Sequence, residues 1–373
     1  MSRSGFGERE SAIVVRGWAG QRGPDELARL AESGVRPRTP YVELARELDA
    51  EVIDATYMTE HGSRAARLVA RRIGIVEGEV VEAFRRRRSY RHVVAWADRV
   101  GLELALLYKL TRSRRDLVLV SNWLTGDAKR VFLERFRVQS HLGAIISYSS
   151  VQLQIATERN MIPTSRLHLA LQPVDEDFWQ PLETVQSDVI CATGWEGRDY
   201  PTLVAAVQGV PIRVELAVGS LVLSAAHRRQ RGQLFEANVG SAVTSAPNVS
   251  YRMDLEPVEV RDLYARSRFV VVPLHDLEYD AGVTSVTEAM AMGKAVIVSR
   301  SRGQVDVIRD GVEGLYVAPG DADALRQAIE RLLSNPDQAE RMGAAGRAAI
   351  LQRHRLDDYV RRVAAIVRRV GAR

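Results

Sequence analysis

Apolar and polar positions follow two alternating patterns along this chain. Short apolar runs between turn residues, such as "SAIVV", "DLVLV" and "LGAIIS", predict buried strands. Other stretches, such as "PYVELARE", carry apolar residues at helical spacing. The alternation restarts with "DVICATG" at residue 188 and continues through "IRVELAVG", "NVSYRM", "RFVVVPL", "KAVIVS" and "GLYVA". Such alternation is typical of parallel sheets covered by helices on both faces, so the chain is predicted to be an α/β protein.

The polar, proline-marked segment 172–188, "QPVDEDFWQPLETVQSD", divides the two series and is the best candidate for a linker. At 373 residues and 46% apolar, the chain is long enough for two hydrophobic cores. We therefore predict an N-terminal domain over residues 1–172 and a second domain over 173–354. Residues 355–373 should form an amphipathic helix that closes the structure and returns towards the first domain.

The cysteine content and the apolar stretches indicate the cellular compartment of the protein. The only cysteine, Cys191, lies in an apolar run, so a disulfide framework is excluded and a reducing compartment is expected. We find neither a signal-peptide core nor an apolar stretch of membrane-spanning length. A cytoplasmic protein is therefore expected, with peripheral attachment at the inner membrane face left open.

An open parallel sheet binds its ligands at the carboxyl ends of its strands. In the second half, three predicted strand ends are followed by residues that could bind a ligand. After "DVICAT" come Gly194 and then Arg198, which can hold an anionic oxygen. After "RFVVVPL", Gly282 precedes a predicted helix whose first amides and dipole form an anion site. Glu288 lies about one turn along that helix. If an anionic group binds at the helix start, Glu288 would face the part of the ligand attached to it. After "NVSY", the backbone near Met253 can meet the edge of a base.

These residues resemble the donor domain of GT-B glycosyltransferases, specifically the retaining family 4 type. The family pattern has two acidic residues eight positions apart followed by Ala-Met-Ala-x-Gly; here Asp280 and Glu288 precede "AMAMGKAVI". The segments "LALQPVDEDFW", "GWEGRDYPTLVAA" and "DGVEGLYVAPGDADALRQAIERLL" are similar to the family's segments in the same order. The resemblance extends over about residues 167–333, and it implies two Rossmann-like βαβ domains facing a cleft.

The resemblance also implies roles for individual residues. Glu288 would bind the ribose hydroxyls of a nucleotide sugar, Arg198 its diphosphate and Asp280 its sugar, and these three would carry the reaction. Gly17 and Gly20 would let the first domain's backbone approach the diphosphate. The other donor-binding positions would be Gly194, Met253, Gly282, Val283, Thr284 and Ser285. The alternatives are an ordinary exposed helix residue at Glu288, a turn residue at Asp280 and a surface ion-pair partner at Arg198.

The function implied is metal-independent transfer of a sugar, most simply from a UDP-sugar, to an acceptor hydroxyl with retention of configuration. The acceptor is a small molecule, a glycan precursor or a lipid, and no cofactor is expected. Two departures from the family pattern keep an alternative open. Asp280 is one methylene shorter than the usual Glu, and Trp195 stands where many members carry a second basic residue. The alternative is a GT-B-shaped protein that binds or scaffolds nucleotide sugars without turnover.

Other chemistries lack their signatures. The Asp-x-Asp pairs at Asp175 and Asp321 are interpreted as structural, the second as a helix cap. The histidines show no metal-ligand spacing, and only His275 lies near the proposed site. No metal site is therefore expected.

The Arg-rich region 64–115 contains most of the local excess of positive charge. Between residues 61 and 115 there are fourteen Lys and Arg against five Asp and Glu, whereas the whole chain has a net charge of only +5. Its cationic side chains and apolar helix faces suit an anionic membrane surface, an anionic acceptor or simply water. Tyr90 and Trp96 fit helix packing as well as base stacking, and nucleic acid is not expected as a partner.

Overall fold

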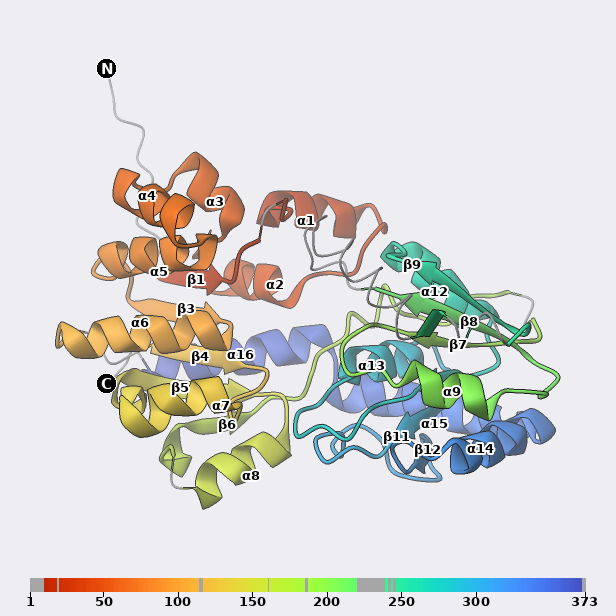
Figure 1. Ribbon diagram of the computed structural model, residues 1–373. Helices are drawn as coiled ribbons and strands as arrows, with labels where there is room; N and C mark the ends of the chain where they lie inside the picture. Colours follow the sequence, from red (N-terminus) through yellow and green to blue (C-terminus); the bar gives the residue numbers. More distant parts are fainter. Residues whose placement is uncertain are drawn as a thin grey trace. The chain divides into compact units, whose positions relative to one another are not determined.

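The computed structural model describes residues 10–18, 20–113, 117–159, 161–184, 187–219, 239–240, 243 and 246–370. The chain divides into two compact units (Figure 1). The first unit comprises residues 1–29, 38–170 and 357–373, and the second comprises residues 30–37 and 171–356. Arg114 and Arg115, at the end of the Arg-rich region, lie outside the described residues. Among the described residues, no helix has the length and apolar character needed to cross a membrane.

The first unit contains a parallel sheet of six strands. Its strand order is β2 (Ala50–Ile53), β1 (Ser11–Val15), β3 (His92–Trp96), β4 (Leu117–Ser121), β5 (Leu142–Ser147) and β6 (Leu167–Leu169). Every residue of β1 is buried, although alternate residues of a strand point to opposite faces. Both faces of this sheet are therefore covered, as the apolar runs predicted.

The helices of the first unit lie between its parallel strands along the chain, except the last, which follows α15 (Pro336–Arg353) of the second unit. They are α2 (Pro40–Glu47), α3 (Ala55–Glu60), α4 (Arg64–Arg72), α5 (Ile75–Arg86), α6 (Asp98–Leu110), α7 (Asp127–Arg130), α8 (Ser150–Glu158) and α16 (Leu356–Val370), with short helical turns η1 (Val131–Arg135), η2 (Val138–His141) and η3 (Thr164–Arg166). One further helix, α1 (Pro24–Glu32), spans the junction at residues 29–30, and α16 begins one residue before the junction at 356–357. The amphipathic helix expected at the C-terminus is confirmed as α16, whose apolar side is buried.

The second unit contains another parallel sheet of six strands. Its order is β12 (Gly314–Val317), β11 (Val296–Ser299), β10 (Val270–Val272), β7 (Val189–Thr193), β8 (Arg213–Val218) and β9 (Val249–Met253). Its helices are α9 (Tyr200–Ala206), α12 (Pro257–Arg266), α13 (Val283–Ala291), α14 (Ala322–Ser334) and α15 (Pro336–Arg353). The two sheets confirm the predicted α/β architecture of two domains.

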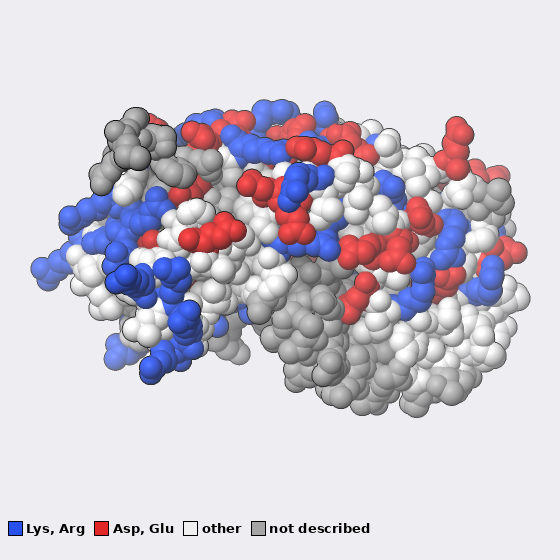
Figure 2. Space-filling model, turned by 90° about the horizontal axis from the view of Figure 1, so that it is seen from above, with Lys and Arg blue, Asp and Glu red and all other residues white. Residues whose placement is uncertain are grey.

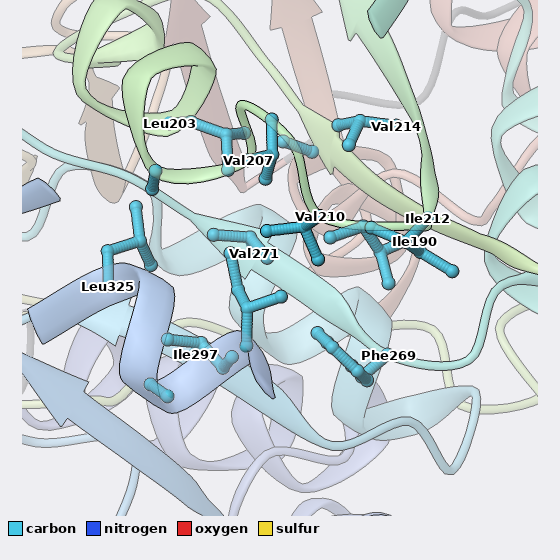
Figure 3. Packing of buried hydrophobic residues seen from close by; sticks show 14 of the residues in the cluster. Ile190, Leu203, Val207, Val210, Ile212, Val214, Phe269, Val271, Ile297 and Leu325 are labelled. Atoms are coloured by element: carbon cyan, nitrogen blue, oxygen red, sulfur yellow. The ribbon is translucent and has the colours of Figure 1, made fainter. Parts of the chain in front are cut away.

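Helices cover each face of the second sheet with a separate core. One core packs Ile190, Val271 and Ile297 of the strands against Leu203 of α9 and Leu325 of α14 (Figure 3). The opposite core joins the alternate strand residues to the buried faces of α12, α13 and α15. Cys191 lies fully buried in this second core, as expected for a small core residue.

Two predicted features are wrong. Trp96 does not lie on a helix face; it ends β3, a central strand, because the β-branched run "HVVAW" dominates its Arg-rich surroundings. The units divide at the edge of segment 172–188, between residues 170 and 171, but its described residues are no free linker, because Phe178 and Trp179 are buried in the second unit's core. Glu176, also buried, accepts bonds from Nε of Arg355 at 2.7 Å and from the amide of Leu356 at 3.2 Å. The segment is thus fastened to the end of the second unit.

The Asp-x-Asp pairs take structural positions. Asp175 is buried beside Glu176 in this fastened segment, and Asp321 caps α14 by accepting a bond of 2.8 Å from the amide of Ala324.

Candidate functional site

The candidate site lies at the carboxyl ends of β7 and β10, which are neighbours in the second sheet. After β7, the loop 194–199 turns through Gly194 at φ +99°. The loop is then tied to the segment after β10: the Asp199 amide donates to the Pro273 carbonyl and the His275 amide to the Gly197 carbonyl, each at 3.0 Å. Asp199 also caps α9, its side chain accepting from the amide of Thr202 at 3.2 Å. These bonds fix the position from which Arg198 extends.

The guanidinium of Arg198 is held by neutral oxygens. Its Nε donates to the Thr193 carbonyl at 2.7 Å, its Nη1 to the Glu196 carbonyl at 2.9 Å and its Nη2 to Oγ of Ser285 at 2.8 Å. Within the described parts of the chain, no carboxylate lies within ion-pairing distance of it. Burial lowers the pKa of Arg198, the largest influence on it. A poorly solvated cation without a paired anion is costly, and an anionic ligand would offset that cost.

The start of α13 lies directly beside this guanidinium. Gly282 takes a left-handed conformation at φ +80°, and a Cβ there would lie 2.9 Å from Val272 Cγ1 and 3.2 Å from Arg198 Nη1. The position therefore demands glycine, as the sequence predicted. The amide of Val283 already donates to the Asp280 carbonyl at 3.2 Å, so it is less available than expected.

The amides of Thr284 and Ser285 have no recorded backbone acceptor within the described residues. They point along the helix axis toward its start, as the first amides of a helix do. Thr284 is exposed, whereas Ser285 is buried and bonded to Arg198. The helix start and the guanidinium together form one electropositive corner.

Glu288 follows one helical turn after this corner. Glu288 is half-buried, and its Oε2 accepts a bond of 3.3 Å from the Tyr264 hydroxyl. Burial raises the pKa of Glu288 to about 8, while the Tyr264 bond and the charge of Arg198 oppose that rise. Once ionised, above about pH 8, the carboxylate can accept further hydrogen bonds from a ligand placed over α13.

Asp280 lies in the turn before α13, with its side chain partly buried. Burial raises the pKa of Asp280 to about 7, and the like charges of Asp306 and Glu196 add to the rise. His275, exposed after β10, lies with Nδ1 3.9 Å from an oxygen of Asp199. It has no contact that assigns it to the site.

The structure brings together only part of the predicted set. Gly194, Arg198, Gly282, Ser285 and Glu288 form one cluster over β7 and α13. Met253 ends β9, paired with Val218 of β8, at the same carboxyl edge but two strands from β7. Gly17 and Gly20 follow β1 in the first unit, and Gly20 has φ +79° with open space where a Cβ would stand.

Sequence reasoning missed two side chains of the site, Thr193 and Tyr264. Thr193 is the last residue of β7 and Tyr264 a buried residue of α12, and their oxygens lie 2.6 Å apart. In the sequence, Tyr264 shows only as an apolar position of a helix. Its hydroxyl gains a role through contacts far along the chain.

The comparisons with known proteins agree on the fold. The Anabaena protein Alr3699/HepE, solved in complex with UDP and glucose, superposes with a TM-score of 0.69 at 13% identity, covering 95% of this chain and 98% of that chain. Sucrose-phosphate synthase from Thermosynechococcus elongatus gives a TM-score of 0.69 at 16% identity, covering 98% of this chain and all of that chain (100%). The chain therefore has the two-domain GT-B fold.

The family match and the sequence relatives cover part of the site. Residues 246–349, which include Asp280 and Glu288, match the family described as glycosyl transferases group 1. A D-inositol 3-phosphate glycosyltransferase from Thermobifida fusca is 33% identical over 96 residues, covering 25% of this chain and 21% of that protein. An alpha-maltose-1-phosphate synthase from Mycolicibacterium smegmatis is 24% identical over 264 residues, 65% of this chain and 66% of that protein. The chain thus spans about a fifth of the first relative's length and about two thirds of the second's.

Proposed function

We propose that this protein is a retaining glycosyltransferase that moves a sugar from a nucleotide sugar to an acceptor hydroxyl. One observation carries the proposal: the guanidinium of Arg198, which pairs with no carboxylate in the described parts of the chain, abuts the start of α13, and Glu288 stands one turn further along. A diphosphate satisfies the guanidinium and the amides of Thr284 and Ser285, and the attached ribose then meets the Glu288 carboxylate.

The chemistry follows from where charge develops. Breaking the bond between sugar and diphosphate builds negative charge on the leaving group, which Arg198 and the helix start stabilise. Positive charge develops on the sugar ring, and an ionised Asp280 beside the sugar stabilises it. The acceptor hydroxyl attacks the face that the diphosphate leaves and passes its proton to the departing diphosphate oxygen, so configuration is retained without a covalent intermediate on the protein. These side chains supply the charge stabilisation that this route needs without a metal.

UDP is the nucleotide we propose. The Anabaena protein of the same fold was solved with UDP-glucose, which motivates the choice. Among curated relatives, a Mycolicibacterium smegmatis mannosyltransferase named for GDP-mannose is 42% identical over 60 residues, 16% of each chain. UDP-, GDP- and ADP-sugars therefore all belong in the test.

The second candidate is a nucleotide-sugar-binding protein without turnover. Trp195 favours this candidate. A basic residue at this position would supply a second cation to the site, whereas Trp195 packs against the core. Arg198 is then left as the one basic side chain of loop 194–199. Weaker stabilisation of the leaving group would slow or abolish transfer while leaving binding intact.

Donor binding and turnover separate these functions. Purified protein is incubated with UDP-, GDP- and ADP-sugars, and the thermal shift and nucleotide release are followed for wild type, Glu288→Ala and Glu340→Ala. Glu340 is an exposed residue of α15 and supplies the same chemical change away from the site. We expect one donor to stabilise wild type and the Glu340 variant, and the Glu288 variant to lose most of that shift. Equal stabilisation of all three would contradict the ribose assignment, and stabilisation without release across acceptor extracts would favour the binding protein.

We also propose that α4, within the Arg-rich region, rests on an anionic membrane surface. Four arginines of α4 are exposed and have no acidic partner among the described residues: Arg64, Arg67, Arg71 and Arg72. Leu68 and Ile73 are exposed beside them, at 57% and 71%. Lys and Arg side chains gather at the end of the first unit that carries α4 (Figure 2). Each such cation near anionic lipid contributes about 1 kcal/mol, and apolar side chains add burial.

Vesicle sedimentation tests this contact. Vesicles with anionic phospholipid should retain the protein at low salt, whereas phosphatidylcholine vesicles should not, and the binding should weaken as salt rises. Arg67→Glu/Arg71→Glu should abolish it. Arg341→Glu/Arg362→Glu makes the same change of net charge at exposed positions of α15 and α16 and should keep it. Equal loss in both double variants would show that the total charge, not α4, drives binding.

A further inference from the structure

Three buried hydroxyl groups form a chain between Arg198 and Glu288. Arg198 Nη2 lies 2.8 Å from Ser285 Oγ, which lies 2.9 Å from Thr193 Oγ1. Thr193 Oγ1 lies 2.6 Å from the Tyr264 hydroxyl, which lies 3.3 Å from Glu288 Oε2. The three hydroxyl residues come from β7, α12 and α13 and are at most 5% exposed. The electropositive corner and the acidic side chain are thus connected through the protein.

The two ends of this chain decide where its protons lie. A guanidinium only donates, so Ser285 Oγ accepts from Arg198; an ionised carboxylate only accepts, so Tyr264 donates to Glu288. The Tyr264 oxygen then accepts from Thr193, and Ser285 donates to Thr193, at Oγ1, 2.9 Å away, or at the carbonyl, 3.3 Å away. If Thr193 instead donated to Ser285, the proton of Tyr264 would go to Thr193 and Glu288 would receive none. Because hydrogen bonds to a charged group are the stronger ones, the first arrangement holds whenever Glu288 is ionised.

We propose that Tyr264 is a positioning residue: its hydroxyl, oriented by Thr193, holds the ionised Glu288 carboxylate ready to accept the vicinal hydroxyls of a nucleotide's ribose. This inference rests on the function proposed above and extends it to a residue of α12. Arg198 and Tyr264 are the charged and titratable groups that face Glu288, from the loop after β7 and from α12. Their combined effect opposes the burial that raises the pKa of Glu288.

The aromatic ring of Tyr264 has a separate structural role, which the test must leave intact. The ring packs against Trp179 with 5.7 Å between centroids and belongs to the second unit's core. Tyr264→Phe keeps this ring and removes only the hydroxyl. In this variant Thr193 still has Ser285 as a hydrogen-bond partner, so the Glu288 carboxylate is the group that loses its donor.

The experiment measures the affinity for UDP, GDP and ADP by calorimetry from pH 6.5 to 9 for wild type, Tyr264→Phe, Glu288→Gln and the double variant. Below the pKa of Glu288 the carboxyl group loses acceptor capacity, so affinity falls as pH decreases. Removing the Tyr264 donor raises that pKa, so this fall should begin at higher pH. Near pH 7 we expect about tenfold weaker nucleotide binding in Tyr264→Phe. The difference should shrink toward pH 9.

Two controls make the result specific. Inorganic pyrophosphate, which lacks ribose, should bind wild type and Tyr264→Phe equally well. Tyr316→Phe, which removes a tyrosine hydroxyl bonded to the Gln304 carbonyl at 3.0 Å, should leave the pH profile unchanged. In the double variant, Tyr264→Phe should add nothing to Glu288→Gln.

The possible outcomes separate the two proposals. If wild type binds a nucleotide and Glu288→Gln weakens it, while Tyr264→Phe leaves affinity and pH profile unchanged, the positioning role is wrong and the proposed function stands. If Tyr264→Phe weakens pyrophosphate and nucleotide equally, its effect is structural and the positioning role is again wrong. If wild type binds none of the three nucleotides, both proposals fail.

Discussion

The amide of Gly17 donates a hydrogen bond of 3.0 Å to Oε2 of Glu79, a fully buried carboxyl group on α5. A Cβ at Gly17 would lie 1.9 Å from Glu79 Oε1 and 3.1 Å from Cβ of Ala55. The glycine is therefore required by packing within the first unit. Its proposed approach to a diphosphate stays a separate prediction.

Gly17→Ala should destabilise the protein by about 1–3 kcal/mol, the usual cost of overpacking a filled site. Urea unfolding at constant pH measures the loss. In a Glu79→Ala background the same substitution should cost much less, because the clashing carboxyl group is gone. An equal cost in both backgrounds would place the strain elsewhere in the loop.

Glu79 should make stability fall with rising pH. Burial raises the pKa of Glu79 from its ordinary value of 4.5 to about 9, and the charges of Asp54 and Glu77 add to the rise. The folded state therefore keeps a proton that the unfolded chain loses between these values, and stability decreases as pH rises through that window. Glu79→Gln cannot ionise and should flatten the decrease, measured by urea unfolding from pH 5 to 9. Asp54, whose pKa burial also raises, leaves a residual slope. Parallel curves would show that Glu79 does not carry the effect.

The parts of the site that the sequence predicted depend on local spacing. Gly282 at the helix start, Glu288 one turn further on and Asp199 before α9 follow from residues close together in the chain. Thr193 and Tyr264 were not predictable in this way. Thr193 meets Ser285 across 92 positions and Tyr264 across 71, so only the pairing of strands and packing of α12 bring them together.

The fold shows the same limit. Apolar runs predicted most strands, because a buried parallel strand needs a continuous apolar stretch. The strand β3 was hidden by its Arg-rich neighbours, and segment 172–188 looked like a linker because polar residues surround the buried Trp179. Local sequence does not show whether a charged residue faces water or pairs with a distant partner. Glu176 is buried and pairs with Arg355, which lies 179 positions further along the chain.

Asp306 should tune the pH dependence of the reaction through Asp280. The pKa of Asp280 is raised to about 7, first by burial and then by the like charges of Asp306 and Glu196. If the ionised Asp280 stabilises the transition state, kcat at saturating donor should fall as pH drops below about 7, whereas kcat/KM would also contain the effect of Glu288 on donor binding. Asp306→Asn removes one like charge, lowers the pKa of Asp280 and should move this fall to lower pH. The control Asp323→Asn, at an exposed position of α14, should leave it in place. An unchanged profile in Asp306→Asn would exclude Asp280 as the group that titrates.

Gly282→Ala should reduce stability and nucleotide binding together. The left-handed φ of +80° strains any side chain, and the added Cβ would also lie 2.9 Å from Val272 Cγ1 and 3.0 Å from Leu274 Cδ2. Gly320 provides the matched control, because it has φ +75° with open space around the Cβ position. Gly320→Ala should therefore show the backbone strain alone, about 1–2 kcal/mol by urea unfolding, with unchanged nucleotide affinity. Gly282→Ala should lose more stability and also weaken nucleotide binding, because α13 and Arg198 must move apart to admit the methyl group. Equal losses in both variants, with affinity intact, would show that the contact between the α13 start and Arg198 does not set the geometry of the anion site.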